Sequence, residues 1–253
     1  MGKSLIQQAR GRGGPAYRVR RQAFRYFISY PPLHALGKAV VRKLINSPAH
    51  TAPLAELEVE FEDKTLDDNG KEIITQKKMK FIIPAAERLY EGQEIFIGKR
   101  PDNRKSEVGD IVQLKDVAQG TKVFNVEKVP GRGGVFLRTA GSSGIIMNKS
   151  NGRVELIIKR RVLLVHENAR AVIGVISGDG RTLKPIVKAG KNFHRMKAIG
   201  RKWHRSSAVK MNAVDHPFGG GRGKRIKSKI AKRNAPAGAK VGHLRPRRTG
   251  RKK

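Results

Sequence analysis

Apolar and polar residues alternate along the middle of the chain, which is the pattern of half-buried β-strands. Apolar residues alternate with glutamates from Leu57 to Glu62. This period of two places apolar side chains on one face of a strand and carboxylates on the other. Because the acidic face would repel RNA, we expect it to point to solvent or to a basic protein neighbour.

Further short segments with strand composition follow, at intervals of roughly ten residues. They are Met79–Ile83, Glu94–Ile97, Ile111–Leu114, Lys122–Val126, Gly144–Met147, Val154–Ile158 and Val162–Val165. Asp67-Asp68-Asn69-Gly70 predicts a hairpin turn, and Asn151-Gly152 predicts a tight type I′ turn because both residues tolerate a positive φ. The stretch Leu36 to Ile45 fits a helix or a strand about equally. The pattern predicts an all-β fold of small barrels.

The charge is very unevenly distributed over the 253 residues. There are 55 Lys and Arg against 20 Asp and Glu, a net charge of +35. Residues 1–50 carry +10, residues 51–179 carry +2 and residues 180–253 carry +23, with Asp215 the one acid in the last segment. The composition therefore predicts a near-neutral folded body between two cationic extensions, which we expect to order on a polyanion.

Nucleic acid is the partner that this charge favours, because Lys and Arg that neutralise phosphates release counterions and bind strongly. The absence of cysteine excludes disulfide scaffolds, thiolate zinc sites and cysteine nucleophiles. No segment approaches the ~20 apolar residues of a membrane span, and the start lacks the apolar core of a signal peptide. These features together predict a cytoplasmic protein with no membrane contact.

Three Gly-Arg-Gly units occur, beginning at Gly11, Gly131 and Gly221. Glycine allows the backbone to approach phosphates closely, while arginine binds them or stacks on bases. The first and third units are predicted RNA contacts, whereas the middle unit is equally well explained as a flexible hairpin tip. No P-loop pattern, metal-ligand spacing of histidines or catalytic constellation is present, so an enzyme is not expected.

The most specific motif lies in the second extension, from Met211 to Gly221. It places one acid, one histidine, one proline and three glycines in a basic field. Asp215 either caps a local turn, which physical reasoning favours, or orients His216. A general-base role for His216 is the enzymatic alternative, and its direction of pKa shift among phosphates and lysines is open at this point.

This motif resembles that of the universal L-two family of large-subunit ribosomal proteins, Met-Asn-x-Val-Asp-His-Pro-x-Gly-Gly-Gly. Supporting matches are Ala52–Ala55, Val108–Asp110, Gly120–Glu127, Pro130–Gly134, Arg138–Gly141 and Gly190-Lys191. Phe218 and the short Gly11–Pro15 start resemble archaeal or eukaryotic cytosolic members. Residues 22–32 fit the family pattern less well.

The resemblance implies a structural constituent of the large ribosomal subunit that binds and stabilises rRNA and is not an enzyme. It implies a basic extension over 1–34, an OB-type barrel over 35–107, an SH3-like barrel over 108–190 and a Gly/Pro-rich basic extension over 191–253. It also implies that Asp215 and His216 approach the peptidyl-transferase region. The expected partners are large-subunit rRNA, neighbouring ribosomal proteins and the small subunit, with no small-molecule substrate. No cofactor is expected apart from Mg²⁺ associated with the rRNA.

The predicted RNA-binding residues lie in the two extensions, with Lys159-Arg160-Arg161 as the best candidate in the body against a solvated turn. They are Arg10, Arg12, Arg18, Arg20 and Arg21, followed by Lys191, Arg195, Lys197, Arg201, Lys202, Trp203, Arg205, Lys210, Asn212, His216, Gly219, Gly220, Gly221, Arg222, Lys224, Arg225, Arg245, Arg247 and Arg248. The alternative function is a DNA-compacting architectural protein. Preference for folded RNA over duplex DNA at matched salt would separate the two.

Overall fold

The computed structural model describes residues 11–19, 21–66, 72–101, 105–204, 206–216 and 218–221. The chain forms two units. One spans Arg20–Ala189, and the other combines the N-terminal residues up to Val19 with the residues from Gly190 onward. The unit Arg20–Ala189 contains all the strands described below, so we call it the β-unit. We call the other unit the arm unit.

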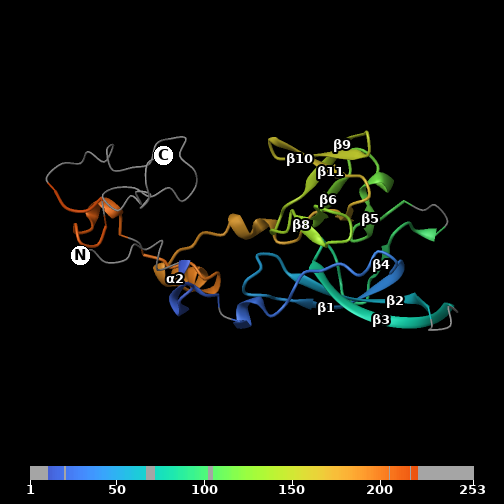
Figure 1. Ribbon diagram of the computed structural model, residues 1–253, viewed down its shortest axis with the longest axis horizontal. Helices are drawn as coiled ribbons and strands as arrows, with labels where there is room; N and C mark the ends of the chain where they lie inside the picture. The colour runs from blue at the N-terminus through green and yellow to red at the C-terminus, as the bar shows by residue number, and fades with distance from the viewer. Residues whose placement is uncertain are drawn as a thin grey trace, which may run out of the picture. The chain divides into compact units, whose positions relative to one another are not determined.

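The β-unit consists of twelve described strands and three short 3-10 turns (Figure 1). The strands are β1 (Gly37–Ile45), β2 (Leu54–Leu66), β3 (Glu72–Pro84), β4 (Glu94–Ile97), β5 (Ile111–Gln113), β6 (Lys122–Phe124), β7 (Val126–Glu127), β8 (Gly134–Phe136), β9 (Gly144–Ser150), β10 (Arg153–Ile158), β11 (Arg161–His166) and β12 (Arg170–Ile173). The turns are η2 (Arg21–Phe24), η4 (Leu114–Asp116) and η5 (Asp179–Thr182).

Ten strands join in one sheet with the order β11-β10-β9-β6-β12-β5-β4-β1-β2-β3, and β7 pairs with β8 separately. The pairs are antiparallel except for the short β4–β5 contact at Ile97 and Ile111. The described residues are thus mostly β, which confirms the predicted class. The sheet is open at β11 and β3, so these pairings do not close either half into a barrel.

Most of the predicted strands are confirmed, and the ambiguous stretch before Asn46 is the strand β1. β2 and β3 pair over their full length, from Leu54–Pro84 to Leu66–Glu72, although the predicted turn at residues 67–70 lies outside the described residues. Asn151 and Gly152 have φ values of 51° and 71°, as a type I′ turn requires. The sequence analysis missed β12, because its four residues are all buried and show no alternation.

Two hydrophobic clusters stabilise the β-unit. The first lies among β1–β4 and includes Leu57, Phe81 and Ile95, all at most 2% exposed. The second lies among β5–β12 and is centred on Ile146 and Leu156, which are completely buried. Leu137 packs against both clusters, and residues from β6 and β12 contribute to each. The two halves therefore share side chains where they meet, as expected for a body that folds as one unit.

Candidate nucleic-acid interface

The arm unit contains the α-helix of the described chain, α2 (Ala189–Ala198). The sequence analysis expected an irregular extension here, because three cations and no acid in ten residues give no sign of an amphipathic helix. The helix ends in a Schellman motif: Gly200 N–H donates to Lys197 O at 3.2 Å, and Arg201 N–H donates to Met196 O at 2.8 Å. Gly200 has the left-handed φ of 67° that this motif requires.

The N-terminal segment contacts the end of this helix. A Cβ at Gly200 would lie 2.6 Å from Val19 Cγ2, so only glycine fits beside this valine. The turn η1 (Pro15–Tyr17) precedes Val19 on the same segment. Two extensions separated by the whole β-unit in sequence therefore meet in one compact unit, which the sequence analysis treated as separate arms.

The cations of the arm unit point outward. Side chains of the described predicted contacts are exposed at Arg12, Arg18, Lys191, Arg195, Lys197, Arg201, Lys202, Lys210 and Asn212. Trp203 is half-buried, with its ring 5.1 Å from that of His204. The two segments of the arm unit contain one acid in their entire sequence, Asp215. Intramolecular ion pairs cannot neutralise so many cations, so this surface strongly attracts a polyanion.

The motif from Met211 to Gly221 forms a compact loop closed by its own backbone. Gly220 N–H donates to Met211 O at 3.1 Å, and Gly219 N–H donates to His216 O at 2.9 Å. A Cβ at Gly219 would lie 2.3 Å from Met211 O, so this glycine is required by the close approach of the two backbones. The turn η6 (Ala208–Lys210) leads into the loop.

His216 has a local role in this loop. Its side chain is buried, and Nδ1 accepts a hydrogen bond from Phe218 N–H at 3.1 Å. The Phe218 ring packs edge-on against the imidazole at 4.9 Å. A ring nitrogen that accepts from the backbone holds the loop in shape, and it is not available at that atom to accept a proton from a substrate.

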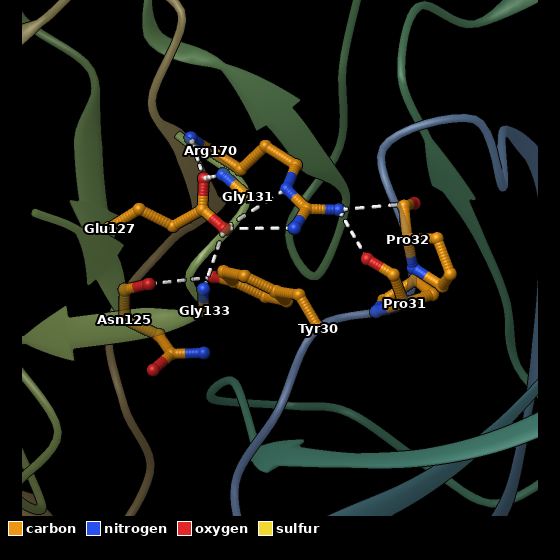
Figure 2. Close-up of polar contacts among 8 residues, drawn as sticks. All are labelled: Tyr30, Pro31, Pro32, Asn125, Glu127, Gly131, Gly133 and Arg170. Carbon is orange, nitrogen blue, oxygen red and sulfur yellow. Dashed lines mark hydrogen bonds and ion pairs between the residues drawn. The ribbon is translucent and has the colours of Figure 1, made fainter. Parts of the chain in front are cut away.

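The middle Gly-Arg-Gly unit is not the flexible hairpin tip that was one of its two interpretations. Gly131 N–H and Gly133 N–H both donate to the carboxylate of Glu127, at 3.2 and 3.0 Å (Figure 2). Both glycines have positive φ, and their amides, on either side of Arg132, point at the same carboxylate. The loop is therefore ordered around an internal carboxylate and is not a flexible tip, and Arg132 at its centre is exposed.

Glu127 is itself completely buried and paired with Arg170 from β12. Arg170 Nη2 lies 2.8 Å and Nε 3.2 Å from Glu127 Oε1, and the Arg170 backbone N–H donates to Oε2 at 2.9 Å. Figure 2 shows the guanidinium between Glu127 and the backbone of Pro31, whose carbonyl accepts from Nη1 at 2.7 Å. The ion pair thus connects the Gly-Arg-Gly loop, β12 and the segment that enters β1.

Tyr30 completes this cluster and assigns a role to part of the 22–32 segment. Its hydroxyl donates to the Asn125 carbonyl at 2.7 Å, and its ring lies 5.0 Å below the Arg170 guanidinium. Burial, reinforced by the negative charge of Glu127, holds the pKa of the Tyr30 hydroxyl far above its ordinary value. Tyr30 is therefore a neutral anchor that, within the β-unit, fixes the segment before β1 to the residues around Asn125 and Arg170.

Arg138 is a candidate contact that the sequence analysis did not select. It is half-buried, and Nη1 donates to the Gly134 carbonyl at 3.2 Å. No acidic side chain pairs with it among the described residues, and burial lowers the pKa of its guanidinium. A partly desolvated cation facing no acid gains most from an external anion. Its motif, Arg138-Thr139-Ala140-Gly141, was the signal that could have indicated it.

The acidic face of β2 is neutralised within the protein. Arg42 Nε lies 2.7 Å from Glu58 Oε2, and Lys78 Nζ lies 2.6 Å from Glu60 Oε1. The hydrogen bond that Arg42 donates lowers the pKa of Glu58, and the hydrogen bond that Lys78 donates to Glu60 raises the pKa of Lys78. The cations come from β1 and β3, the strands on either side. At Glu58 and Glu60 the cations that face these carboxylates therefore belong to the same sheet and not to a separate protein.

The remaining predicted residues are placed as follows. Lys159, Arg160 and Arg161 form an exposed turn between β10 and β11. The predicted contacts Arg10, Arg20, Arg205, Arg222, Lys224, Arg225, Arg245, Arg247 and Arg248 lie outside the described residues, as does the side chain of Arg21. In the described part of the chain no group of acidic or histidine side chains could hold a metal ion, and no helix is long and apolar enough to cross a membrane.

Comparison with known proteins decides the family. Residues 107–238 match the family model described as Ribosomal Proteins L2, C-terminal domain. The chain belongs to the L-two family, now written uL2. It is 38% identical over 256 residues to the "Large ribosomal subunit protein uL2" of Sulfurisphaera tokodaii, covering 100% of this chain and 99% of the relative. The equivalent uL2 protein of Hyperthermus butylicus is 39% identical over 256 residues, covering 100% of both chains.

A third uL2 relative, from Archaeoglobus fulgidus, is 38% identical over 255 residues and is covered to 99% on both sides. These matches confirm the resemblance found in the sequence, including its archaeal character. Because they run along the complete relatives, they include the arm unit as well as the β-unit. The matched region therefore includes both cationic extensions of this chain.

Proposed function

We propose that the chain, as a uL2 protein, is a structural and non-enzymatic constituent of the large ribosomal subunit, in the cytoplasm, that binds and stabilises rRNA. The observation that carries this proposal is the separation of charge between the two units. Acids of the β-unit are paired with neighbouring cations, as at Glu58, Glu60 and Glu127. The arm unit has many exposed cations and one acid.

The RNA contacts are proposed to lie mainly on the arm unit. The described members are Arg12, Arg18, Lys191, Arg195, Lys197, Arg201, Lys202, Trp203, Lys210, Asn212, His216 and Gly219–Gly221, to which we add Arg138 in the β-unit. The exposed cations act as fixed counterions where RNA strands pack closely. A half-buried indole such as Trp203 offers a surface on which an unpaired base can stack.

The loop that holds Asp215 and His216 is proposed to approach the peptidyl-transferase region and to support association with the small subunit. Its self-closed backbone supports this proposal, because a preformed loop can enter a crowded RNA environment at little further cost in conformational entropy. Within this proposal His216 keeps the loop in shape and the peptide-bond chemistry belongs to RNA.

The two halves of the β-unit are proposed to correspond to an OB-type barrel over 35–107 and an SH3-like barrel over 108–190, between extensions over 1–34 and 191–253. The two separate hydrophobic clusters support this division. Neighbouring ribosomal proteins complete the proposed set of partners. In this proposal the barrels are not the main source of phosphate contacts.

Crosslinking in intact cells, followed by sequencing of the attached nucleic acid, tests this function. We expect crosslinks in large-subunit rRNA, with those from the Met211–Gly221 loop near the peptidyl-transferase region. A matched sample has Arg195 and Lys197 both changed to Glu. Crosslinks that this double change removes come from the arm unit, and crosslinks that remain can come from the β-unit. Crosslinks distributed over chromosomal DNA would instead support the DNA-compacting alternative and contradict the proposal.

A further inference from the structure

The sheet formed by β9, β10 and β11 is apolar on both of its faces. Its inner face is completely buried at Ile146, Val154 and Leu156. Its outer face carries apolar side chains that are 37–62% exposed, at Ile145, Met147, Val162 and Leu164. An antiparallel sheet with one face in solvent normally alternates apolar with polar residues. The outer face departs from this rule.

The register gathers these outer side chains into one patch. Ile157 is directly opposite Ile145 on one side and Val162 on the other. Leu164 lies opposite Glu155 in the next row, where a bulge in β9 accommodates Met147. Because side chains opposite each other across a ladder are in contact range, Ile145, Ile157 and Val162 form one apolar row, and Leu164 and Met147 lie on either side of Glu155 in the next row. We call these five residues, Ile145, Met147, Ile157, Val162 and Leu164, the outer patch.

Cations surround the outer patch at its two ends. Lys159, Arg160 and Arg161 are exposed in the turn at one end, and Arg153 is exposed at the other. The one acid in the described rows of the patch is Glu155. β11 is also an end strand of the sheet, so its outer edge pairs with no described strand. Figure 1 shows these strands at the opposite side of the β-unit from β2 and β3.

We propose that the outer patch is a docking surface for a neighbouring protein of the large subunit that presents aliphatic side chains flanked by acidic residues. Aliphatic side chains are stabilised by contact with other apolar surface. Single-stranded RNA is instead bound by aromatic platforms, and no aromatic side chain belongs to the patch. The cationic rim disfavours a second copy of this chain and disfavours its own basic extensions, because both would bring like charge.

A photo-crosslinking amino acid at Val162 tests this inference in purified large subunits. We expect one nuclease-resistant protein adduct whose crosslinked peptide contains more acidic than basic residues. Met147 provides an independent second position on the patch. Tyr90, which is 63% exposed on the other half of the β-unit, serves as the matched position outside it and should not give the same adduct. Arg153→Glu should lower the yield from Val162 at least fivefold.

Several results would overturn the inference. They are an adduct to RNA, to a second copy or to the chain's own extensions, a basic crosslinked peptide, or no adduct from either patch position. The inference rests on the chain being part of the large subunit, and sedimentation separates the two claims. A chain that does not sediment with large subunits contradicts the proposed function, whereas a chain that does so without a protein adduct contradicts only the docking surface.

Discussion

Glu127 and Arg170 form a buried ion pair that joins three parts of the β-unit which are distant in sequence. The Glu127 side chain is completely buried and that of Arg170 is 4% exposed, with 2.8 Å between Oε1 and Nη2. The Glu127 carboxylate also accepts hydrogen bonds from the amides of Gly131, Gly133 and Arg170. This saturation is what makes a buried charge tolerable, since an unpaired one would be strongly destabilising.

Glu127→Ala is therefore expected to lower the free energy of unfolding by about 3–5 kcal/mol, because it leaves the Arg170 guanidinium buried without its partner. Urea unfolding of the full chain, followed by circular dichroism of the β-unit, measures the change. Glu94→Ala is the matched control, since it breaks the exposed pair with Lys38 and should cost no more than about 1 kcal/mol. Equal losses in both variants would contradict the role given to the cluster.

His50 is expected to make the stability of the β-unit depend on pH. Burial, and then the charge of Arg138, lower the pKa of His50 below its ordinary value of 6.5. The unfolded chain therefore takes up the proton at a higher pH than the folded chain, and stability is lost as pH falls through about 6.5 toward the folded pKa. His50→Gln should reduce this loss, measured as the difference between the two curves of unfolding free energy against pH.

The effect of the Arg138 charge on the pKa of His50 can be measured on the imidazole directly. Arg138→Met removes a nearby positive charge and should raise the pKa of His50, followed by NMR of the imidazole protons. Ser47 Oγ, 2.8 Å from His50 Nδ1, remains in place in this variant. An unchanged His50 pKa would mean that burial alone is responsible for the shift.

The sequence predicted the fold where side chains alternate. The hairpin of β9 and β10 was predicted from the Asn151-Gly152 turn between two segments of strand composition. The sequence could not predict β12, because each of its four residues is buried and none alternates with a polar residue. It also could not predict the pairing of Glu127 with Arg170, because two charges 43 positions apart resemble ordinary surface residues in a sequence. The helix α2 was not predicted, because its three cations and lack of acids resemble the rest of the basic extension.

The residues of the candidate site also divide into those that the sequence could predict and those that required the structure. Exposed cations such as Lys191 and Arg195 were predicted from charge alone, because long runs of basic residues without acids have no internal partner. Arg138 required the structure, since its importance comes from partial burial and from the Gly134 carbonyl beside it. The Gly131 loop was misinterpreted in one respect: its amides bind a carboxylate of the same chain, which spacing alone does not reveal.

Arg138→Met should weaken binding to large-subunit rRNA by about 10- to 150-fold while leaving the stability of the free protein equal or higher. The loss corresponds to one charge-assisted contact of roughly 1.5–3 kcal/mol, and the gain comes from removing a half-buried cation that no described acid neutralises. Binding is measured by fluorescence anisotropy with an rRNA fragment. Lys78→Met, which removes a cation already paired with Glu60, is the control and should bind normally.

Removing residues 220–253 should make RNA binding much less dependent on salt. This segment holds 14 Lys and Arg and no acid, and each phosphate contact contributes about 0.7–0.9 to the slope of log affinity against log salt concentration. The β-unit should still fold, since none of its core residues is removed. A slope equal to that of the full chain would show that the β-unit carries the phosphate contacts.

His216→Ala is expected to impair subunit assembly or subunit joining more than peptide-bond formation. The substitution removes the hydrogen bond from Phe218 N–H and the ring contact that shape the Met211–Gly221 loop. His216→Asn, which retains a side-chain acceptor near the same amide, should recover part of the assembly. Peptide-bond formation is measured in particles that have assembled and joined normally. A loss of more than about 100-fold in such particles, the size expected for a missing general base, would contradict the structural role of His216.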